Sequence, residues 1–360
     1  MGTSKIQRSA DGAVLTDERL LLTDLSAIEL ADRLELKPFQ GRQIFGWLHK
    51  RNQFDFDQMT DLSKELRERL KRDCDAGTLE LAACERSERS GTKKALFRLR
   101  DGESVEAVLI RDRDRVTLCV SSQVGCAVKC SFCATGIGGY ARNLSPGEIV
   151  EQVFYLLKDE DLGERSPNIV FMGMGEPFRN YESVLKSIRL MMAPEGLGIG
   201  ARRITVSTAG EAPRIEEFAS EDWQVRLSVS LHAANDSLRD QLVPLNRKYN
   251  LSRLRQAVSQ YQERTGRLVT FEWALLDGVN DSIEHAKELL RWAEGLVVHV
   301  NVIPYNPVEG LPYAAPSRRT CEKFRDTLSR GGMNVTFRSE RGQDIDAACG
   351  QLRRRQLASH

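Results

Sequence analysis

The chain has 360 residues, of which 41% are hydrophobic, so it can bury a sizeable core without disulfide bonds. Its 52 lysines and arginines balance 51 aspartates and glutamates, and a net charge of +1 argues against nucleic-acid binding through a global positive field. No apolar run approaches the roughly 20 residues of a membrane span, and residues 1–11 lack the apolar core of a secretory signal. We therefore expect a cytoplasmic protein with no membrane partner, whose eight cysteines are ligands or reactive thiols.

The first part of the chain has the pattern of a small helical and β domain. Residues 26–72 show helical periodicity, with Pro38 suited to a first helical turn and a charged stretch over 64–72 that is typical of a solvated helix face. Residues 94–100 and 103–110 alternate on either side of Asp101 and Gly102, a dipeptide that favours a tight hairpin. These elements predict an accessory domain over residues 1–111.

Strand and helix patterns alternate in the following region, 112–345, which we predict to be the core domain. Expected strands lie at 116–121, 168–172, 203–208, 225–231, 268–275, 297–303 and 334–338, and expected helices at 149–158, 181–192, 251–264, 283–292 and 319–330. Such repeated units predict an α/β fold with a parallel sheet curled into a full or partial (βα) barrel. Residues 346–360 then form a C-terminal tail.

The polar motifs of the core follow its strands. The cysteine loop follows the first strand, GMGEP the second, STAG the third, SLHAAN the fourth and PYNP the sixth. In βα barrels the loops at the carboxyl ends of the strands build the active site. The distribution therefore predicts one pocket assembled from several loops.

The most specific pattern is CAVKCSFC, which places Cys126, Cys130 and Cys133 within eight residues directly after a strand. Iron–sulfur clusters usually have four thiolate ligands, so three local thiolates leave one iron able to bind another molecule. Zinc is one alternative, but zinc sites prefer two cysteine pairs or histidine partners, and the sequence has no second pair. Three inert buried thiols are the other alternative.

This loop, placed after a first barrel strand, resembles the radical S-adenosylmethionine (SAM) superfamily. The resemblance implies a partial barrel of the radical SAM type, with a 4Fe–4S cluster on Cys126, Cys130 and Cys133 whose open iron binds SAM. It also implies that the GMGEP segment, with Gly175 and Glu176, binds the SAM amino group. Polar positions after later strands would singly be ordinary turn residues, but their placement predicts further cofactor contacts from Ser207, Ser230, Leu231, His232 and Asn306.

Nearly the whole chain resembles the RlmN/Cfr family of RNA adenine methyltransferases. The matching segments are KPFQGRQIFGWLH, TLCVSSQVGCAVKCSFCATG, GMGEP, SLHAAND, LVPLNRKYN, IPYNP and DIDAACGQL. The resemblance implies that Cys349 accepts a methyl group from one SAM, and that a second SAM supplies the radical that activates this group toward the base. It further implies that Cys119 forms a disulfide with Cys349 to free the RNA, and that Glu106 takes the proton from the ring carbon. From local sequence alone Cys119 would be a core residue, Glu106 solvent-facing and Cys349 incidental.

The same resemblance implies the partners and the reaction. It implies methylation of adenine C2 in 23S rRNA, with tRNA left open as a further substrate, and an external electron donor such as flavodoxin or ferredoxin. Arg341 and Gly342 before DIDAACGQL favour the RlmN type, whereas STAG departs from the STSG of that type. Basic stretches at 67–72, 86–94, 202–203 and 353–355 are candidates for phosphate contacts, although each alone is more typical of a solvated surface.

Three alternatives stay open at this point. The first is methylation at adenine C8, as in the Cfr type. The second is a non-catalytic iron–sulfur or zinc protein that binds RNA. The third is a radical SAM enzyme that acts on another substrate.

Overall fold

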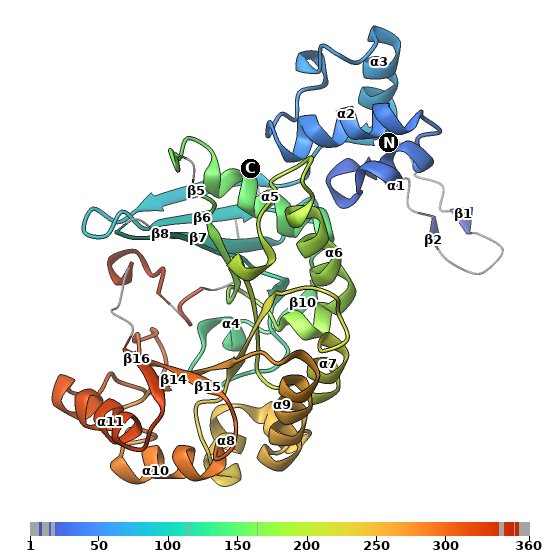
Figure 1. Ribbon diagram of the computed structural model, residues 1–360. Coiled ribbons are helices and arrows are strands. Elements are labelled where there is room, and N and C mark those ends of the chain that lie inside the picture. Colours follow the sequence, from blue (N-terminus) through green and yellow to red (C-terminus); the bar gives the residue numbers. More distant parts are fainter. Residues whose placement is uncertain are drawn as a thin grey trace.

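The structure is a computed structural model that describes residues 19–113, 115–163, 165–337, 342–348 and 350–352, together with the backbone of two short paired strands, β1 (Gln7–Arg8) and β2 (Val14–Leu15). Figure 1 shows a small helical part at the N-terminal end and a larger part built around one curved sheet. Among the described residues, none of the helices has both the length and the apolar character needed to cross a membrane.

The helical part consists of α1 (Ala27–Arg33), α2 (Pro38–His49) and α3 (Lys64–Asp73). Ser26 begins α1 by accepting a hydrogen bond from the backbone N–H of Glu29, whose carboxylate accepts from the N–H of Ser26 in return. In α3 only Leu66 and Leu70 are buried, so its charged residues face solvent as predicted. The short strands β3 (Leu20–Leu21) and β4 (Cys74–Asp75) pair at the base of this part.

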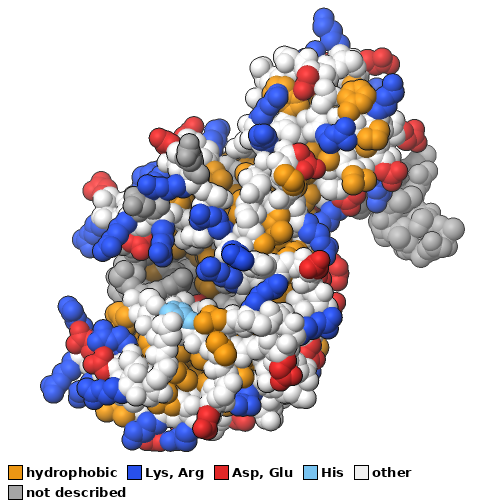
Figure 2. All heavy atoms as spheres, viewed as in Figure 1, with side chains coloured by type: hydrophobic (Ala, Val, Ile, Leu, Met, Phe, Trp, Pro, Cys, Tyr) orange, Lys and Arg blue, Asp and Glu red, His pale blue; other side chains and the backbone are white. Residues whose placement is uncertain are grey.

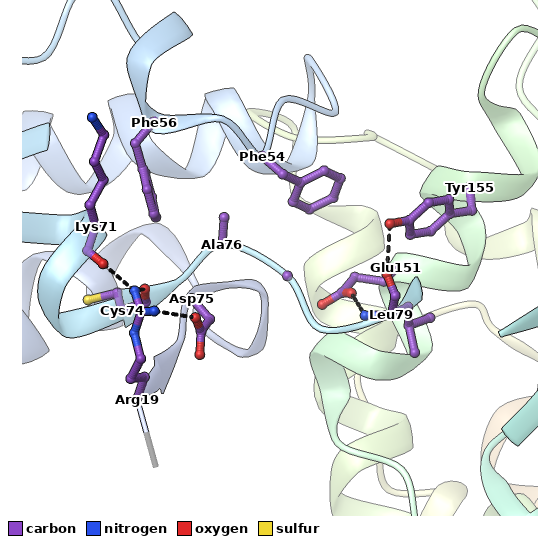
Figure 3. A pocket seen from close by; sticks show the side chains of 11 residues that line it. Arg19, Phe54, Phe56, Lys71, Cys74, Asp75, Ala76, Leu79, Glu151 and Tyr155 are labelled. Carbon is purple, nitrogen blue, oxygen red and sulfur yellow. Dashed lines mark hydrogen bonds and ion pairs between the residues drawn. The ribbon is translucent and has the colours of Figure 1, made fainter. Parts of the chain in front are cut away.

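The helical part joins the core through residues 74–79 and helix α5 (Pro146–Leu157). A cavity of about 320 Å³ lies at this junction, and Figure 3 shows the side chains that line it. One of its polar residues is Glu151, whose carboxylate accepts from the backbone N–H groups of Thr78 at 2.7 Å and Leu79 at 2.8 Å. The hydroxyl of Tyr155 donates to the carbonyl of Leu79 at 2.7 Å. These bonds tie the connecting segment to α5, so the cavity belongs to the domain junction.

A histidine packs into the same junction. His49, at the end of α2, stacks on Phe45 at 4.0 Å between ring centroids and meets the edge of Phe154 of α5 at 5.4 Å. Burial lowers the pKa of His49 to about 3, so the imidazole is neutral in the folded protein.

The central sheet has ten strands in the order β16-β15-β14-β13-β12-β11-β8-β7-β6-β5. Neighbouring strands from β8 to β16 pair in parallel, and β5 to β8 pair antiparallel. The sheet is open because β16 and β5 are edges, which confirms a partial barrel. The strands are β5 (Glu80–Arg86), β6 (Lys93–Arg98), β7 (Ser104–Asp112), β8 (Arg115–Cys119), β11 (Asn168–Phe171), β12 (Ile204–Thr208), β13 (Arg226–Ser230), β14 (Val269–Leu275), β15 (Val298–Pro304) and β16 (Asn334–Phe337).

Helices cover one face of the parallel strands (Figure 1). They are α6 (Tyr181–Met192), α7 (Ala212–Phe218), α8 (Asp236–Leu242), α9 (Leu251–Thr265), α10 (Ile283–Trp292) and α11 (Arg318–Arg330). The strand residues that face them are apolar and fully buried, among them Val206, Val229, Phe271 and Val300. The other face of the strands is therefore free to line the barrel interior.

All the expected strands of the core form, and so does the hairpin around Asp101 and Gly102. The division of the chain at residue 111 stays a prediction. Across that position β7 pairs with β8, with Asp112 opposite Arg115 and Val108 opposite Cys119. The hairpin strands thus continue the barrel sheet without a break.

Candidate active site

The inner face of the parallel strands is polar. Across neighbouring strands Ser207 is paired with Ser228, Ser230 with Glu272, and Glu272 with Asn301, so these side chains project to one side. The hydroxyls of Ser207 and Ser230 lie 3.5 Å apart. The two serines expected from sequence therefore share one surface, together with three polar residues that the sequence did not single out.

Glu272 is fixed at the centre of this surface. Its Oε1 accepts from the Ser228 hydroxyl at 3.0 Å and from the Asn301 amide at 2.9 Å. The residue is 5% exposed, and Oε2 has no hydrogen-bond partner among the residues that the structure describes. A buried carboxylate oxygen is costly to leave unpaired, so this atom is suited to accept a hydrogen bond from a bound molecule.

The cysteine loop begins after β9 (Gln123–Gly125) and ends at α4 (Ala134–Ile137), whose N-cap is Cys133. Its path depends on Gly125, which has φ of 77° and where a Cβ would lie 1.8 Å from the carbonyl oxygen of Gly139. This close approach lets β9 pair with β10 (Tyr140–Asn143) directly behind the loop.

The three thiols lie against an apolar cluster that includes Val128, Phe132, Leu242, Leu276 and Tyr305. Burial raises the pKa of Cys126 to about 12, and the negative charges of Glu176 and Cys133 add to the shift. Burial, then Cys133 and Cys126, raises the pKa of Cys130 well above its usual range. If the three neighbouring thiols ionise in these apolar surroundings, they would need a positive counter-charge, which bound iron would supply.

The donor set suits an iron–sulfur cluster. Within the described ranges no three His, Cys, Asp or Glu side chains converge on one metal-ion position. In a 4Fe–4S cluster each thiolate binds a different iron, so the sulfurs do not share one ion. Cys126, Cys130 and Cys133 come from one loop and act on one another's charge, so their donor set suits such a cluster.

The GMGEP turn places Glu176 beside this loop. Gly175 has φ of 105°, and a Cβ there would lie 2.6 Å from the Cβ of Gln123, so only glycine fits. The Glu176 carboxylate accepts from the backbone N–H groups of Ala209 at 2.7 Å and Phe178 at 3.1 Å. Burial raises the pKa of Glu176 to about 7. Each carboxylate oxygen can accept a further bond, so the group remains suited to an ammonium donor.

The SLHAAN segment is anchored mainly through its backbone. Leu231 is fully buried in the core, and its N–H donates to the carbonyl of Glu272 at 3.1 Å. His232 has φ of 59°, its Nδ1 accepts from the N–H of Ala274 at 3.0 Å, and burial followed by the charge of Arg239 lowers its pKa to about 3. Its ring meets the edge of Phe132 in the cysteine loop at 4.7 Å. Asn306 is also buried, after β15.

Arg239 of α8 is another residue that the sequence reasoning missed. It is completely buried and donates to the carbonyls of Ala209 at 2.7 Å and Leu231 at 3.1 Å, and to the amide oxygen of Asn246 at 2.9 Å. Burial lowers its pKa to about 10, and the residue stays charged beside Cys130. It thus joins the loops after β12 and β13 to each other, and its charge acts on the cysteine loop.

Glu106 and Cys119 share one face of the sheet. Cys119 lies opposite Val108, and Glu106 is two residues before Val108 on the same strand. Diagonal neighbours of this kind are about 7–8 Å apart. The Ser121 hydroxyl donates to the carbonyl of Glu106 at 2.6 Å, and Glu106 is 1% exposed. The geometry brings the two predicted residues together, while Cys349 lies outside the described residues.

Several residues of the basic stretches form ion pairs. Glu160 pairs with Arg86 at 2.5 Å and with Arg111, and Lys71 pairs with Asp57 at 2.6 Å. In Figure 2 the Lys and Arg side chains alternate with acidic ones over much of the visible face. A second cavity, of about 410 Å³, is lined by arginines around the turn between β7 and β8 and of the segments before β11 and β12, together with Asp161. In the sequence 111–115 arginine and aspartate alternate. Residues 353–355 lie outside the described part of the chain.

Comparisons with known proteins agree with this geometry. The model of the radical SAM superfamily matches residues 120–293, and that of the ribosomal RNA large subunit methyltransferase N-terminal domain matches residues 22–75. A dual-specificity RNA methyltransferase RlmN from Staphylococcus saprophyticus is 48% identical over 88% of this chain and 86% of its own, and the Desulfitobacterium hafniense protein of that name is 45% identical over 94% and 98%.

A solved structure extends the match to three dimensions. The crystal structure of a radical SAM methyltransferase from Sphaerobacter thermophilus is 47% identical and covers 93% of this chain and 99% of that chain, with a TM-score of 0.90. The chain belongs to the RlmN family of radical SAM methyltransferases.

Proposed function

We propose that this protein methylates C2 of an adenine in 23S rRNA, and that tRNA is a further substrate. Its family is named for RNA methyltransferases, and the placement of Glu106 and Cys119 on one face of the sheet is the observation that supports the proposal most directly. The cluster ligands would be Cys126, Cys130 and Cys133, and SAM would lie against Glu176 and the polar inner face. The cluster and SAM, when bound, supply the methyl group and the radical chemistry.

The residues of the chain have distinct tasks in this scheme. Cys349 carries the methyl-derived carbon and links it to the base. Glu106, buried on the same face as Cys119, takes the proton from the ring carbon.

Cys119 then ends the reaction. Its thiolate attacks the sulfur of Cys349, an S–S bond forms, and the bond between that sulfur and the base-linked carbon breaks. The electron pair stays on that carbon, which takes up a proton and becomes the methyl group. We also propose that the reaction takes place in the cytoplasm with electrons from flavodoxin or ferredoxin.

The experiment is anaerobic reconstitution followed by methylation of protein-free rRNA, with mass spectrometry of the digested nucleosides. We expect 2-methyladenosine. For Cys119→Ala we expect a covalent protein–RNA adduct in place of product, whereas Cys84→Ala, which changes an exposed cysteine of β5, should leave turnover unchanged.

Three results would contradict the proposal. Formation of 8-methyladenosine alone would mean C8 chemistry. Turnover that persists in both Cys119→Ala and Cys349→Ala would mean another mechanism. Reconstituted protein that forms no 5′-deoxyadenosine from SAM would point to a non-catalytic RNA-binding role.

A further inference from the structure

We propose that Lys94 is a positioning residue for this reaction, which holds the C-terminal segment against the face of the sheet where Glu106 and Cys119 lie. The inference rests on the proposed function, because that function gives Cys349 of this segment its role. Lys94 belongs to β6 and is only 3% exposed.

Two adjacent lysines of β6 have opposite surroundings. The Lys93 amine donates to the carbonyl of Tyr155 on α5 at 3.4 Å. The Lys94 amine donates to the carbonyl of Ile345 in the C-terminal segment and lies 3.6 Å from the carboxylate of Glu85. Successive strand residues point to opposite faces of a sheet, so Lys93 fixes the sheet to the helix while Lys94 contacts the segment on the other side.

Strand register places Lys94 among the predicted reacting residues. Lys94 is opposite Val108 on β7, and Val108 is opposite Cys119 on β8. Glu106 is the diagonal neighbour of both Lys94 and Cys119, at about 7–8 Å. A buried ammonium group therefore shares its face with the carboxylate and the thiol that the reaction needs.

The segment that Lys94 contacts is fixed again near the cysteine loop. The carbonyl of Gly350 accepts from the N–H of Ala134 at 2.9 Å, and that of Leu352 accepts from the Thr135 hydroxyl at 2.5 Å. Ala134 directly follows Cys133, so this anchor is part of the loop that would hold the cluster. The described part of the segment thus runs from the hairpin sheet to the cluster loop.

The chemistry of the Lys94 contact favours a positioning role. Burying an ammonium group is costly, and an apolar side chain of the same length would pack there without that cost. A bond to a main-chain carbonyl fixes the path of the segment whatever its side chains are. Charge-assisted bonds of this kind change an equilibrium by about ten- to a hundredfold.

The test compares Lys94→Met, Lys94→Arg and the matched control Lys93→Met in the full, cluster-loaded chain. Hydrogen exchange of the peptide covering residues 342–352 reports how firmly the segment is held. We expect exchange to be about tenfold faster in Lys94→Met, restored in Lys94→Arg, and unchanged in Lys93→Met.

A second readout follows the chemistry at Cys349. The mass of the C-terminal peptide after addition of SAM gives the rate of Cys349 methylation, which should fall by a similar factor in Lys94→Met and recover in Lys94→Arg. The affinity of the cluster-loaded protein for SAM should keep its wild-type value, because Lys94 contacts the C-terminal segment and Glu85.

Equal exchange and equal methylation of the peptide in Lys94→Met and the wild type would overturn the inference, and so would the same losses in Lys93→Met. A different result would overturn the proposed function. In that result Lys94→Met exposes the C-terminal segment to faster exchange as expected, but the wild-type protein methylates no RNA. The two failures are therefore distinguishable.

Discussion

Replacing His49 with leucine should remove an acid-sensitive element from the junction between the helical part and the core. The imidazole lies between Phe45 and Phe154, and neither ring nitrogen has a hydrogen-bond partner among the described residues. Burial lowers the pKa of His49 from 6.5 to about 3. Below pH 6.5 the unfolded chain takes up a proton that the folded protein excludes, so folding free energy is lost as the pH falls.

The magnitude follows from the pKa difference. At pH 5, which is 1.5 units below the pKa of the unfolded chain, protonation of residue 49 stabilises the unfolded state by about 2 kcal/mol, at 1.36 kcal/mol per unit. Between pH 7 and pH 5 the free energy of unfolding should therefore fall by about 2 kcal/mol less in His49→Leu than in the wild type. At pH 7 the variant should be at least as stable, because leucine buries no unpaired nitrogen.

The assay is urea unfolding of both proteins at pH 7, 6 and 5. Buried groups such as Glu151 and Glu176, whose raised pKa values act with the opposite sign, cancel in the difference between the two proteins. Leu48→Val, which changes a buried residue of the same helix that has no ionisable group, is the control and should keep the wild-type pH dependence. Parallel stability curves for His49→Leu and the wild type would refute the reasoning.

Three further substitutions test other buried groups. Burial raises the pKa of Glu151 to about 7, so its contribution to the free energy of unfolding is present at low pH and lost as the pH rises through 7. Glu151→Gln should therefore remove roughly 3 kcal/mol of the change in unfolding free energy between pH 4.5 and 8. An unchanged dependence of the urea midpoint on pH would contradict this. Arg239→Met removes the hydrogen bonds to three buried acceptors, of which the Leu231 carbonyl still accepts from the N–H of Ala233, and should cost about 3 kcal/mol in urea unfolding; a cost below about 1 kcal/mol would be inconsistent with the bonds described. Glu272→Ala should weaken binding of S-adenosylhomocysteine to the cluster-loaded protein about tenfold in calorimetry, and unaltered affinity would mean that its free oxygen does not face the cofactor.

Much of the fold follows from local patterns. Helices α6 and α10 have the bounds that periodicity predicts, and Ser282 caps α10 as such a sequence should. Helices α7 and α8 have seven residues each, too few for the 3.6-residue period to become visible. Short helices of this kind are defined by packing against the sheet.

Only part of the site could be predicted from the sequence, for a related reason. The cysteine loop and GMGEP are contiguous motifs, so their chemistry is visible in a single stretch. Glu272 and Asn301 alternate with apolar residues, a pattern that usually means solvent exposure, but here the polar face lines the barrel. Glu106 has the same pattern and is 1% exposed, because whether a strand face is covered depends on distant parts of the chain.

The continuity of the sheet across residue 111 limits how the protein can be divided. A truncation there would strip β7 from β8 and leave the backbone groups of β8 unpaired at a new edge, which invites association with other chains. In the intact protein that edge is β5, a strand exposed along its whole length and rich in charged residues. A shortened variant without the helical part would therefore be better begun near residue 79, where β5 and its protective charges are kept.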